Sequence, residues 1–374
     1  MLLTILLTVS NAGAKVTGVC SNCHTMHNSQ NGSTVNANGP YGYLLNDTCV
    51  GCHSNSDGND TIVNGTPMVL TSTEPTYPPD GSSSSTLAGG NFYWLVNGNG
   101  SYDKNTLGHN VVSISGVSQD PNTTDGPPGG FGTSDFNSCG YCHGKGQLGD
   151  CTSCHVPRHH TEDHPDNYNN VLDESSGFYR FLGRQWTNTA LPSAVYNNIK
   201  SFHNNAGVKG IEDSSWEQNP SSTAHNEYAG ETSHTSGLSG GYDSISDWCG
   251  GCHGEFHYRT NQGAVGNGSP WLRHPTDFKL GDATGTEYIY NTTDGTNFGP
   301  YNPLVPIARA DIDSYDGSGP SSTVSGDDQV QCLSCHRAHG SPYPDMLRWD
   351  YSTCNAGTPN SNCGCFVCHT KKDE

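Results

Sequence analysis

The pentapeptide Cys-x-x-Cys-His occurs seven times in this chain of 374 residues, and it constrains the fold more than any other feature. The copies are CSNCH (20–24), CVGCH (49–53), CGYCH (139–143), CTSCH (151–155), CGGCH (249–253), CLSCH (332–336) and CFVCH (365–369). Two such cysteines can hold the edge of a porphyrin by thioether bonds, and the adjacent histidine then lies under the iron. The repeat predicts seven covalently attached c-type haems.

The predicted attachment residues follow from the motif. The thioether cysteines are Cys20, Cys23, Cys49, Cys52, Cys139, Cys142, Cys151, Cys154, Cys249, Cys252, Cys332, Cys335, Cys365 and Cys368. The proximal iron ligands are His24, His53, His143, His155, His253, His336 and His369.

Two other interpretations of the cysteines explain less. Structural zinc is held by paired Cys-x-x-Cys knuckles, but it does not need a histidine directly after every knuckle. A disulfide within each Cys-x-x-Cys pair would be strained and easily reduced.

Fourteen of the sixteen cysteines belong to the motifs, which leaves Cys354 and Cys363. In an oxidising compartment we expect these two to form a disulfide, with a free or metal-binding pair as the alternative.

Eleven further histidines are available as distal ligands, more than seven bis-histidine haems require. In CSNCHTMH, His27 follows the proximal His24 by three residues, which advance a helical chain by only about 4.5 Å. His27 therefore cannot reach the opposite face of its own porphyrin, so it must serve another haem. The same spacing, or one slightly longer, recurs in CHRAH (335–339), CHGEFH (252–257) and CTSCHVPRHH (151–160). Each such segment predicts two haems in close contact.

A distal histidine fills the sixth coordination position of the iron, which excludes substrate binding unless a ligand leaves. The pattern therefore favours an electron carrier and not an enzyme. A multihaem reductase acting on oxyanions of nitrogen or sulfur is the alternative from another class. It would need a five-coordinate haem, and an anchor with another residue in place of histidine would be expected.

The composition determines what can form the core. Only 32% of the residues are hydrophobic, whereas glycine occurs 47 times and proline 21 times. Hydrophobic periodicity is weak, and Asn-Gly turns interrupt it. We expect mostly irregular coil with short helices at the motifs and few short strands. Residues 15–374 should form one multihaem cytochrome domain around a stacked haem chain, because the porphyrins replace a side-chain core.

The N-terminal segment and the net charge indicate where in or outside the cell the protein is located. MLLTILLTVSNAGA (1–14) is an apolar run that ends in small residues, as an export signal does, although it lacks a basic start. No later apolar run is long enough to cross a membrane. The net charge of −20 argues against nucleic acid as a partner. The sequence thus predicts an exported protein, extracellular or at the cell surface, with the periplasm as the alternative.

Several segments resemble the extracellular, filament-forming multihaem cytochromes of metal-reducing bacteria. They are CSNCHTMHNSQ (20–30), LGHNVV (107–112), FYRFLG (178–183), ISDWCGGCHGEFH (245–257), LRHP (272–275) and CLSCHRAHGS (332–341). The resemblance implies a head-to-tail homopolymer in which His27 ligates a haem of the neighbouring subunit. It implies His109, His257, His274 and His339 as distal ligands within the subunit.

The chain also departs from this family. The anchor at 139–143 looks like an addition, and the family's CxxCHxxH has become CTSCHVPRHH, where His159, His160 or His164 can be the distal ligand. In this segment we expect His159 to be the distal ligand. For the seventh distal ligand we expect His203, with His225 and His234 as alternatives. The expected function is long-range extracellular electron transfer through seven haems, with redox cytochromes and extracellular acceptors as partners. A soluble periplasmic electron shuttle is the alternative.

Overall fold

The computed structural model describes residues 19–25, 29–30, 33–34, 44, 48–77, 86–123, 128, 149–155, 157, 159, 177–183, 207–231, 244–250, 253, 256, 274–282, 290, 298–312, 315 and 319–372. The anchor at 139–143 lies outside these residues, as do Cys252, His27, His203 and His257.

Each of the six anchors in the described part of the chain lies on a short helical segment. Five of them begin it, whereas Cys249 lies near the end of its helix. The segments are η1 (Cys20–Asn22), η2 (Cys49–Gly51), η5 (Cys151–Ser153), α4 (Ile245–Gly250), α6 (Cys332–Cys335) and α7 (Cys365–Cys368). In every one, the histidine N–H donates to the carbonyl of the first cysteine, at 2.8 to 3.1 Å. Residues three apart lie on one face of such a turn, so both cysteines of an anchor face the same way. The short helices expected at the motifs are confirmed.

The remaining described helices are α1 (Tyr93–Asn97), η3 (Lys104–Thr106), η4 (Pro121–Thr123), η6 (Tyr179–Phe181), η7 (Leu280–Asp282), η8 (Pro344–Met346) and η9 (Tyr351–Thr353). The strands are β1 (Ser29–Gln30), β2 (Ser33–Thr34), β3 (Ser54–Asn55), β4 (Ile62–Val63), β5 (Thr66–Pro67), β6 (Leu70–Thr71), β7 (Gly210–Ile211), β8 (Glu227–Ala229), β9 (Phe278–Lys279), β10 (Ala308–Arg309) and β11 (Gln329–Val330). Strands of two or three residues joined by coil agree with the expected fold class.

One sheet connects distant parts of the chain. Its five strands are ordered β7-β8-β10-β11-β9. Strands β8 and β10 pair in parallel, with Ala308 opposite Tyr228, whereas the other pairs are antiparallel. The small sheet therefore holds the 207–231 region against the C-terminal third of the chain.

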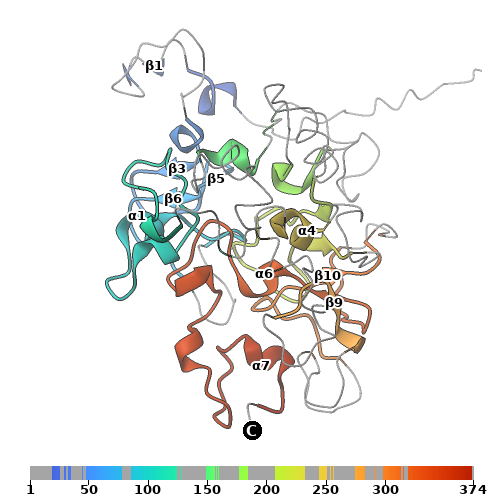
Figure 1. Ribbon diagram of the computed structural model, residues 1–374. Helices are drawn as coiled ribbons and strands as arrows, with labels where there is room; N and C mark the ends of the chain where they lie inside the picture. The colour runs from blue at the N-terminus through green and yellow to red at the C-terminus, as the bar shows by residue number, and fades with distance from the viewer. Residues whose placement is uncertain are drawn as a thin grey trace, which may run out of the picture.

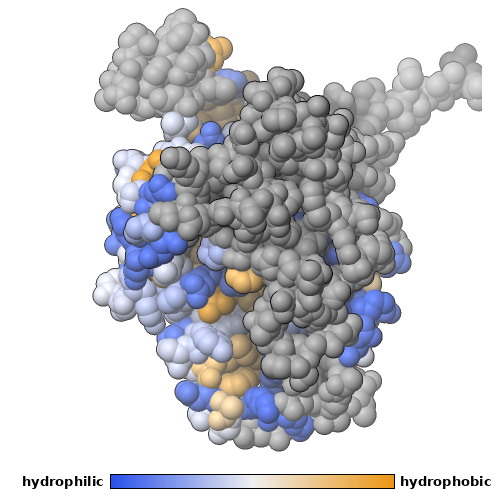
Figure 2. All heavy atoms as spheres, in the orientation of Figure 1, coloured by the Kyte–Doolittle hydropathy of each residue, from blue (hydrophilic) through white to orange (hydrophobic). Residues whose placement is uncertain are grey.

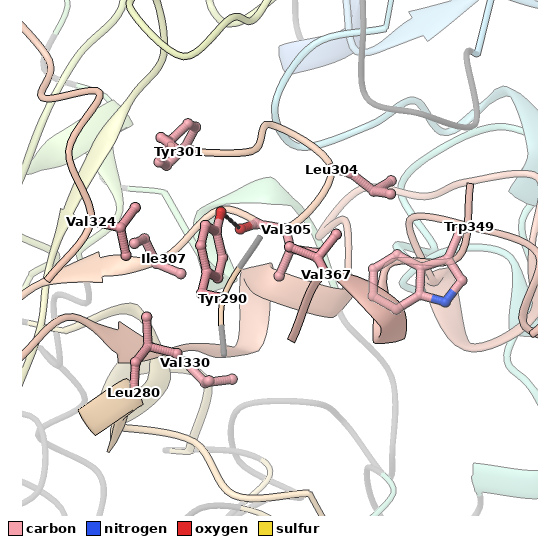
Figure 3. Close-up of a cluster of buried hydrophobic side chains, with 10 residues drawn as sticks. All are labelled: Leu280, Tyr290, Tyr301, Leu304, Val305, Ile307, Val324, Val330, Trp349 and Val367. Atoms are coloured by element: carbon pink, nitrogen blue, oxygen red, sulfur yellow. Dashed lines mark hydrogen bonds between the residues drawn. The ribbon is translucent and has the colours of Figure 1, made fainter. Parts of the chain in front are cut away.

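Small apolar clusters lie beside the anchors instead of forming one large core. The largest consists of Leu280, Tyr290, Tyr301, Leu304, Val305, Ile307, Val324, Val330, Trp349 and Val367 (Figure 3). Within it, the Tyr290 hydroxyl donates to the Val305 carbonyl at 2.8 Å. The anchor cysteines Cys335, Cys365 and Cys368 pack against this cluster. Two smaller clusters contact Cys249 and Cys151. The apolar residues are thus gathered where the haems would attach.

The elements follow one another across the molecule. Strand β1 lies at one end of the view in Figure 1, α4 and α6 lie near the middle, and α7 lies at the opposite end. Much of the described surface on the face shown in Figure 2 is hydrophilic. Within the described residues, no helix is long and apolar enough to span a membrane.

Three glycine-containing segments cross in direct backbone contact. Gly340 forms bridges with both Gly90 and Gly108. A Cβ atom on Gly340 would lie 2.6 Å from the Leu107 carbonyl oxygen and 2.8 Å from that of Asn91. Only glycine allows the chains to approach so closely. The crossing fixes the residues next to it in sequence, His109 and His339.

We predict that Gly340→Ala lowers the free energy of unfolding by about 1–3 kcal/mol, because the added methyl group overlaps two carbonyl oxygens. Gly58→Ala is the matched control, since its Cβ would have no atom within 4 Å. Denaturant unfolding of the two variants measures the difference. Equal midpoints for Gly340→Ala and wild type would contradict the tight crossing.

Candidate haem-binding histidines and anchors

Four pairs of histidine rings face each other, and each pair joins one motif histidine to one histidine outside the motifs. The pairs are His53 with His159, His155 with His339, His253 with His109, and His369 with His274. Their ring centres are 6.1, 6.0, 6.1 and 6.3 Å apart, respectively. The members of each pair come from different segments, so tertiary packing brings them together.

This separation fits one metal ion between two rings. An imidazole nitrogen binds a metal at about 2.0 Å and lies about 1.1 Å from its ring centre, so two rings on opposite sides of one iron have centres about 6 Å apart. Directly packed aromatic rings in this chain range from 3.5 Å between the centres of His225 and Tyr301 to 6.2 Å between those of His253 and Phe256. The four facing pairs differ from these contacts because the same spacing recurs and each pair includes a motif histidine. The four facing pairs therefore have the spacing that bis-histidine haem ligation requires.

The hydrogen bonds to backbone carbonyls use the same ring nitrogen, Nδ1, in each of these histidines. Nδ1 of each of six paired or motif histidines lies 2.6 to 3.0 Å from a backbone carbonyl oxygen. The partners are His53 with Pro67, His109 with Ala338, His155 with Arg180, His253 with Pro128, His274 with Pro275, and His336 with Asp345. A carbonyl only accepts, so Nδ1 carries the hydrogen and Nε2 presents its lone pair. Such a bond orients a metal-ligating histidine.

Two of these carbonyls belong to unusual turns. Arg180 and Asp345 have φ angles of 47° and 57°, and the residue after each, Phe181 or Met346, is also in the left-handed region. Non-glycine residues adopt this conformation at a cost and only where their surroundings enforce it. Nothing in the sequence marks these residues as partners of a motif histidine. They are contributors to the site that the motif search missed.

The first three described anchors lie next to one another. Burial, and then the neighbouring thiol of Cys52, raise the pKa of Cys23. A hydrogen bond between the thiols of Cys49 and Cys151 lowers the pKa of Cys49 to about 6. The anchors at 20–24, 49–53 and 151–155 are therefore consecutive neighbours.

The anchor at 249–253 lies next to the anchor at 151–155 and so extends this row of neighbouring anchors. Burial, and then the rings of His155 and His109, lower the pKa of His339 to about 3, so His339 stays neutral, as a metal ligand must be. His109 faces His253, so the anchors at 151–155 and 249–253 are also close.

Helix α6, which carries the anchor at 332–336, contacts both α4 and α7, which carry the anchors before and after it. The Cys332 N–H donates to the Ser246 hydroxyl of α4 at 3.2 Å. Burial, and then the thiols of Cys365 and Cys368 on α7, raise the pKa of Cys335 to about 12. The six described anchors therefore form one row in sequence order.

His225, an alternative for the seventh distal ligand, occupies a different environment. Its ring is 1% exposed and stacks on Tyr301. Nδ1 lies 2.9 Å from the Ser221 carbonyl, and Nε2 lies 3.8 Å from a carboxylate oxygen of Glu227. Both ring nitrogens therefore face protein groups, although Nε2 has no hydrogen-bond partner. The choice of the seventh distal ligand stays a prediction.

The leftover cysteines Cys354 and Cys363 form a disulfide. The bond closes a loop directly before the last anchor, and its Cys363 is buried. His27, His203, His257 and the 139–143 anchor are outside the described residues, so their roles remain predictions.

Comparisons with known proteins agree with this arrangement. The family model "doubled CXXCH motif" matches residues 324–374. The C-type cytochrome OmcS of Geobacter sulfurreducens is 26% identical over 366 residues, covering 88% of this chain and 78% of OmcS. Two solved structures of OmcS filaments from that organism each cover 96% of this chain and 93% of theirs. Their TM-scores are 0.53 and 0.51, at 19% and 20% identity. The chain is OmcS-like in sequence and in fold, and the resemblance seen in the motif segments is confirmed.

The environment of Glu227 predicts a pH dependence of stability. Burial alone would raise the pKa of Glu227, but the neighbouring His225 ring, the Arg309 guanidinium and the hydrogen bond from the Ser321 N–H together lower it below its usual 4.5. A carboxyl group with a lowered folded-state pKa stabilises above its unfolded pKa, and this contribution is lost as the pH falls through the folded pKa.

We predict that Glu227→Gln lowers stability at pH 7 by about 3 kcal/mol and flattens its dependence on pH below 4.5. Denaturant titrations across that range test both effects. A variant that keeps the wild-type slope would refute the assignment.

Proposed function

We propose that the chain transfers electrons over long distances outside the cell, through seven bis-histidine c-type haems, as the subunit of a polymeric filament. The row of six described anchors in sequence order is the observation that carries this proposal. It is supported by the likeness to OmcS, of which two filament structures are known. The chain is an electron carrier and not an enzyme.

The facing histidines account for the proposed iron ligation. His53, His155, His253 and His369 would bind from the anchored side of their haems, and His159, His339, His109 and His274 from the opposite side. The bound haem supplies an iron that cycles between Fe(II) and Fe(III). With one histidine of each pair on either side of the haem, water and small substrates would have no access to the iron.

Two short segments would connect neighbouring haems. His155 and His159 belong to one segment but face different partners: His155 faces His339, and His159 faces His53. His336 and His339 likewise belong to one segment, in which His336 follows its own anchor and His339 faces His155. Each segment would therefore hold two irons a few residues apart, which keeps the haems close enough for electron transfer.

We predict that His109→Ala converts about one haem per chain from low spin to high spin, because the haem anchored at 249–253 loses its distal ligand. Absorption and EPR spectra of the purified haem-loaded protein measure the change. His225→Ala is the matched control, because it removes a histidine whose ring nitrogens both face protein groups. We expect this control to be less stable yet fully low spin. An absence of high-spin haem in His109→Ala would overturn the pairing, whereas high-spin haem in His225→Ala would assign His225 as the seventh distal ligand.

The polymer is a separate part of the proposal. His27 would bind a haem of the next subunit, and a head-to-tail contact of this kind propagates into a fibre when its rotation does not close. We predict that His27→Ala abolishes filaments while leaving the monomer folded and loaded with haem. Negative-stain images and sedimentation measure this outcome. Filaments that persist in His27→Ala would reject the intersubunit ligand, and a wild-type protein that stays monomeric would favour a periplasmic shuttle.

The proposed location is extracellular, at or beyond the cell surface. Other cytochromes would deliver electrons, and extracellular acceptors would receive them.

A further inference from the structure

The same backbone turn occurs beside two of the anchors. Residues 180–181 and residues 345–346 are pairs in the left-handed region, with φ angles of 47° and 58° in the first pair and 57° at both positions of the second. A leucine follows each pair, and its N–H donates to the carbonyl three residues before it, at 2.8 Å for Leu182 and 3.2 Å for Leu347. We call these segments the 180–181 turn and the 345–346 turn.

Each turn contacts the histidine of its anchor twice. The leucine forms an antiparallel bridge with the histidine, Leu182 with His155 and Leu347 with His336. The carbonyl oxygen two residues before that leucine lies 3.0 Å from Nδ1 of His155 in the first turn and 2.7 Å from Nδ1 of His336 in the second. One contact therefore fixes the main chain of the histidine, and the other fixes its ring.

The left-handed angles direct this carbonyl toward the ring. Because the bridge fixes the leucine, the φ and ψ angles of the two residues before it determine where the carbonyl points. Residues other than glycine adopt left-handed angles at a cost and normally one at a time. A pair of them persists only where its surroundings enforce it. Of the three such pairs without glycine in the described residues, two bind a motif histidine, and the third, 216–217, accepts from the Ala88 N–H.

The two turns are held by different contacts. Glu212 accepts from the backbone N–H of Arg180 at 2.9 Å, and its other carboxylate oxygen pairs with the Arg180 guanidinium at 3.3 Å. At the second turn, the Arg337 N–H donates to the Met346 carbonyl at 2.9 Å. The residues that supply the two carbonyls, Arg180 and Asp345, also have opposite charges. The turns therefore share their backbone and not their side chains.

A hydrogen bond from Nδ1–H changes how a histidine binds a metal. It fixes the orientation of the ring and makes Nε2 more basic. A more basic ligand stabilises Fe(III) more than Fe(II), and hydrogen bonds around the ligands are among the factors that set the reduction potential of a haem. Loss of such a bond would therefore raise the potential of that haem.

We propose that the residues of the 180–181 and 345–346 turns are positioning residues for two proximal histidines, and that they lower the reduction potentials of the haems anchored at 151–155 and 332–336. They act through the backbone, by holding one carbonyl on Nδ1 of His155 or His336. This inference rests on the proposed haem binding. It adds that the side chains of the turn matter only as far as they permit the left-handed conformation.

The test replaces the exposed Asp345 in the haem-loaded protein. Asp345→Asn and Asp345→Gly remove the carboxylate but suit left-handed angles, whereas Asp345→Val removes it and disfavours these angles, because Val is β-branched. The loss of charge is common to all three variants. Spectroelectrochemical titration gives the potential of each haem, and infrared difference spectra with ¹⁵N-labelled histidine report on the hydrogen bond of Nδ1.

Gly100→Val is the matched control for a β-branched residue in the left-handed region. Gly100 has a φ angle of 78°, it is exposed, and a Cβ atom there would have no atom within 4 Å. It belongs to none of the anchors. We expect Gly100→Val to lower the midpoint of denaturant unfolding, as Asp345→Val does, and to leave the potential of every haem unchanged.

In Asp345→Val we expect one haem to show about a tenfold higher Fe(II)/Fe(III) ratio at a fixed applied potential than in Asp345→Asn, together with a shifted histidine band. Asp345→Gly should match Asp345→Asn. Equal potentials in the Val and Asn variants would overturn the inference. So would an equal shift in Gly100→Val, because the shift would then follow from destabilisation in general.

Arg180 provides a second test if Asp345→Val does not fold. Arg180→Asn and Arg180→Val both lose the ion pair with Glu212, so the difference between them reports on the turn alone. The Val variant should have the higher potential at the haem anchored at 151–155, and equal potentials would count against the proposal.

Haem content by mass spectrometry separates the two levels of inference. Wild-type protein without haem at 332–336 would refute the proposed function itself. Full haem content with equal potentials in the Val and Asn variants would refute only the positioning role of the turns.

Discussion

Histidine rings that face each other at about 6 Å determine how this chain is organised. Each described pair joins an anchor to a ring from elsewhere in the sequence, so every proposed iron would cross-link two segments. This matters because the chain has few other long-range connections. Its strands are two or three residues long, and its apolar clusters are small and lie beside the anchors. The porphyrins would supply both the missing apolar volume and the missing cross-links.

The motifs predicted a large part of this structure. Cys-x-x-Cys-His folds as one turn because its hydrogen bond, from the histidine to the first cysteine, is local. The coil was equally predictable, since glycine, proline and weak periodicity leave no long amphipathic segments. The short spacings also predicted that His159 and His339 lie away from their own anchors, and their rings do face His53 and His155 of other anchors. These features depend on a few consecutive residues, so sequence reasoning reaches them.

The rest depends on packing between distant segments. Nothing local indicates that His339 faces His155, or that His225 is enclosed by Tyr301 and Glu227. The left-handed turns at Arg180 and Asp345 are equally invisible in the sequence, because neither position is a glycine or an asparagine. The neutral hydrogen-bond partners of the buried Arg337 and Arg348, in contrast to the ion pairs of Arg309, also become evident only in the structure.

The glycine crossing near His109 and His339 has a mechanical consequence. It holds His109 and His339, which would ligate two different haems, beside a contact in which backbone atoms pack directly on backbone atoms without any intervening side chain. Side chains can exchange rotamers, so the distance across a side-chain contact can change. A contact between main-chain atoms has no such freedom. The spacing between these two cofactors should therefore vary little with thermal motion, which favours a steady electronic coupling at this step of the path.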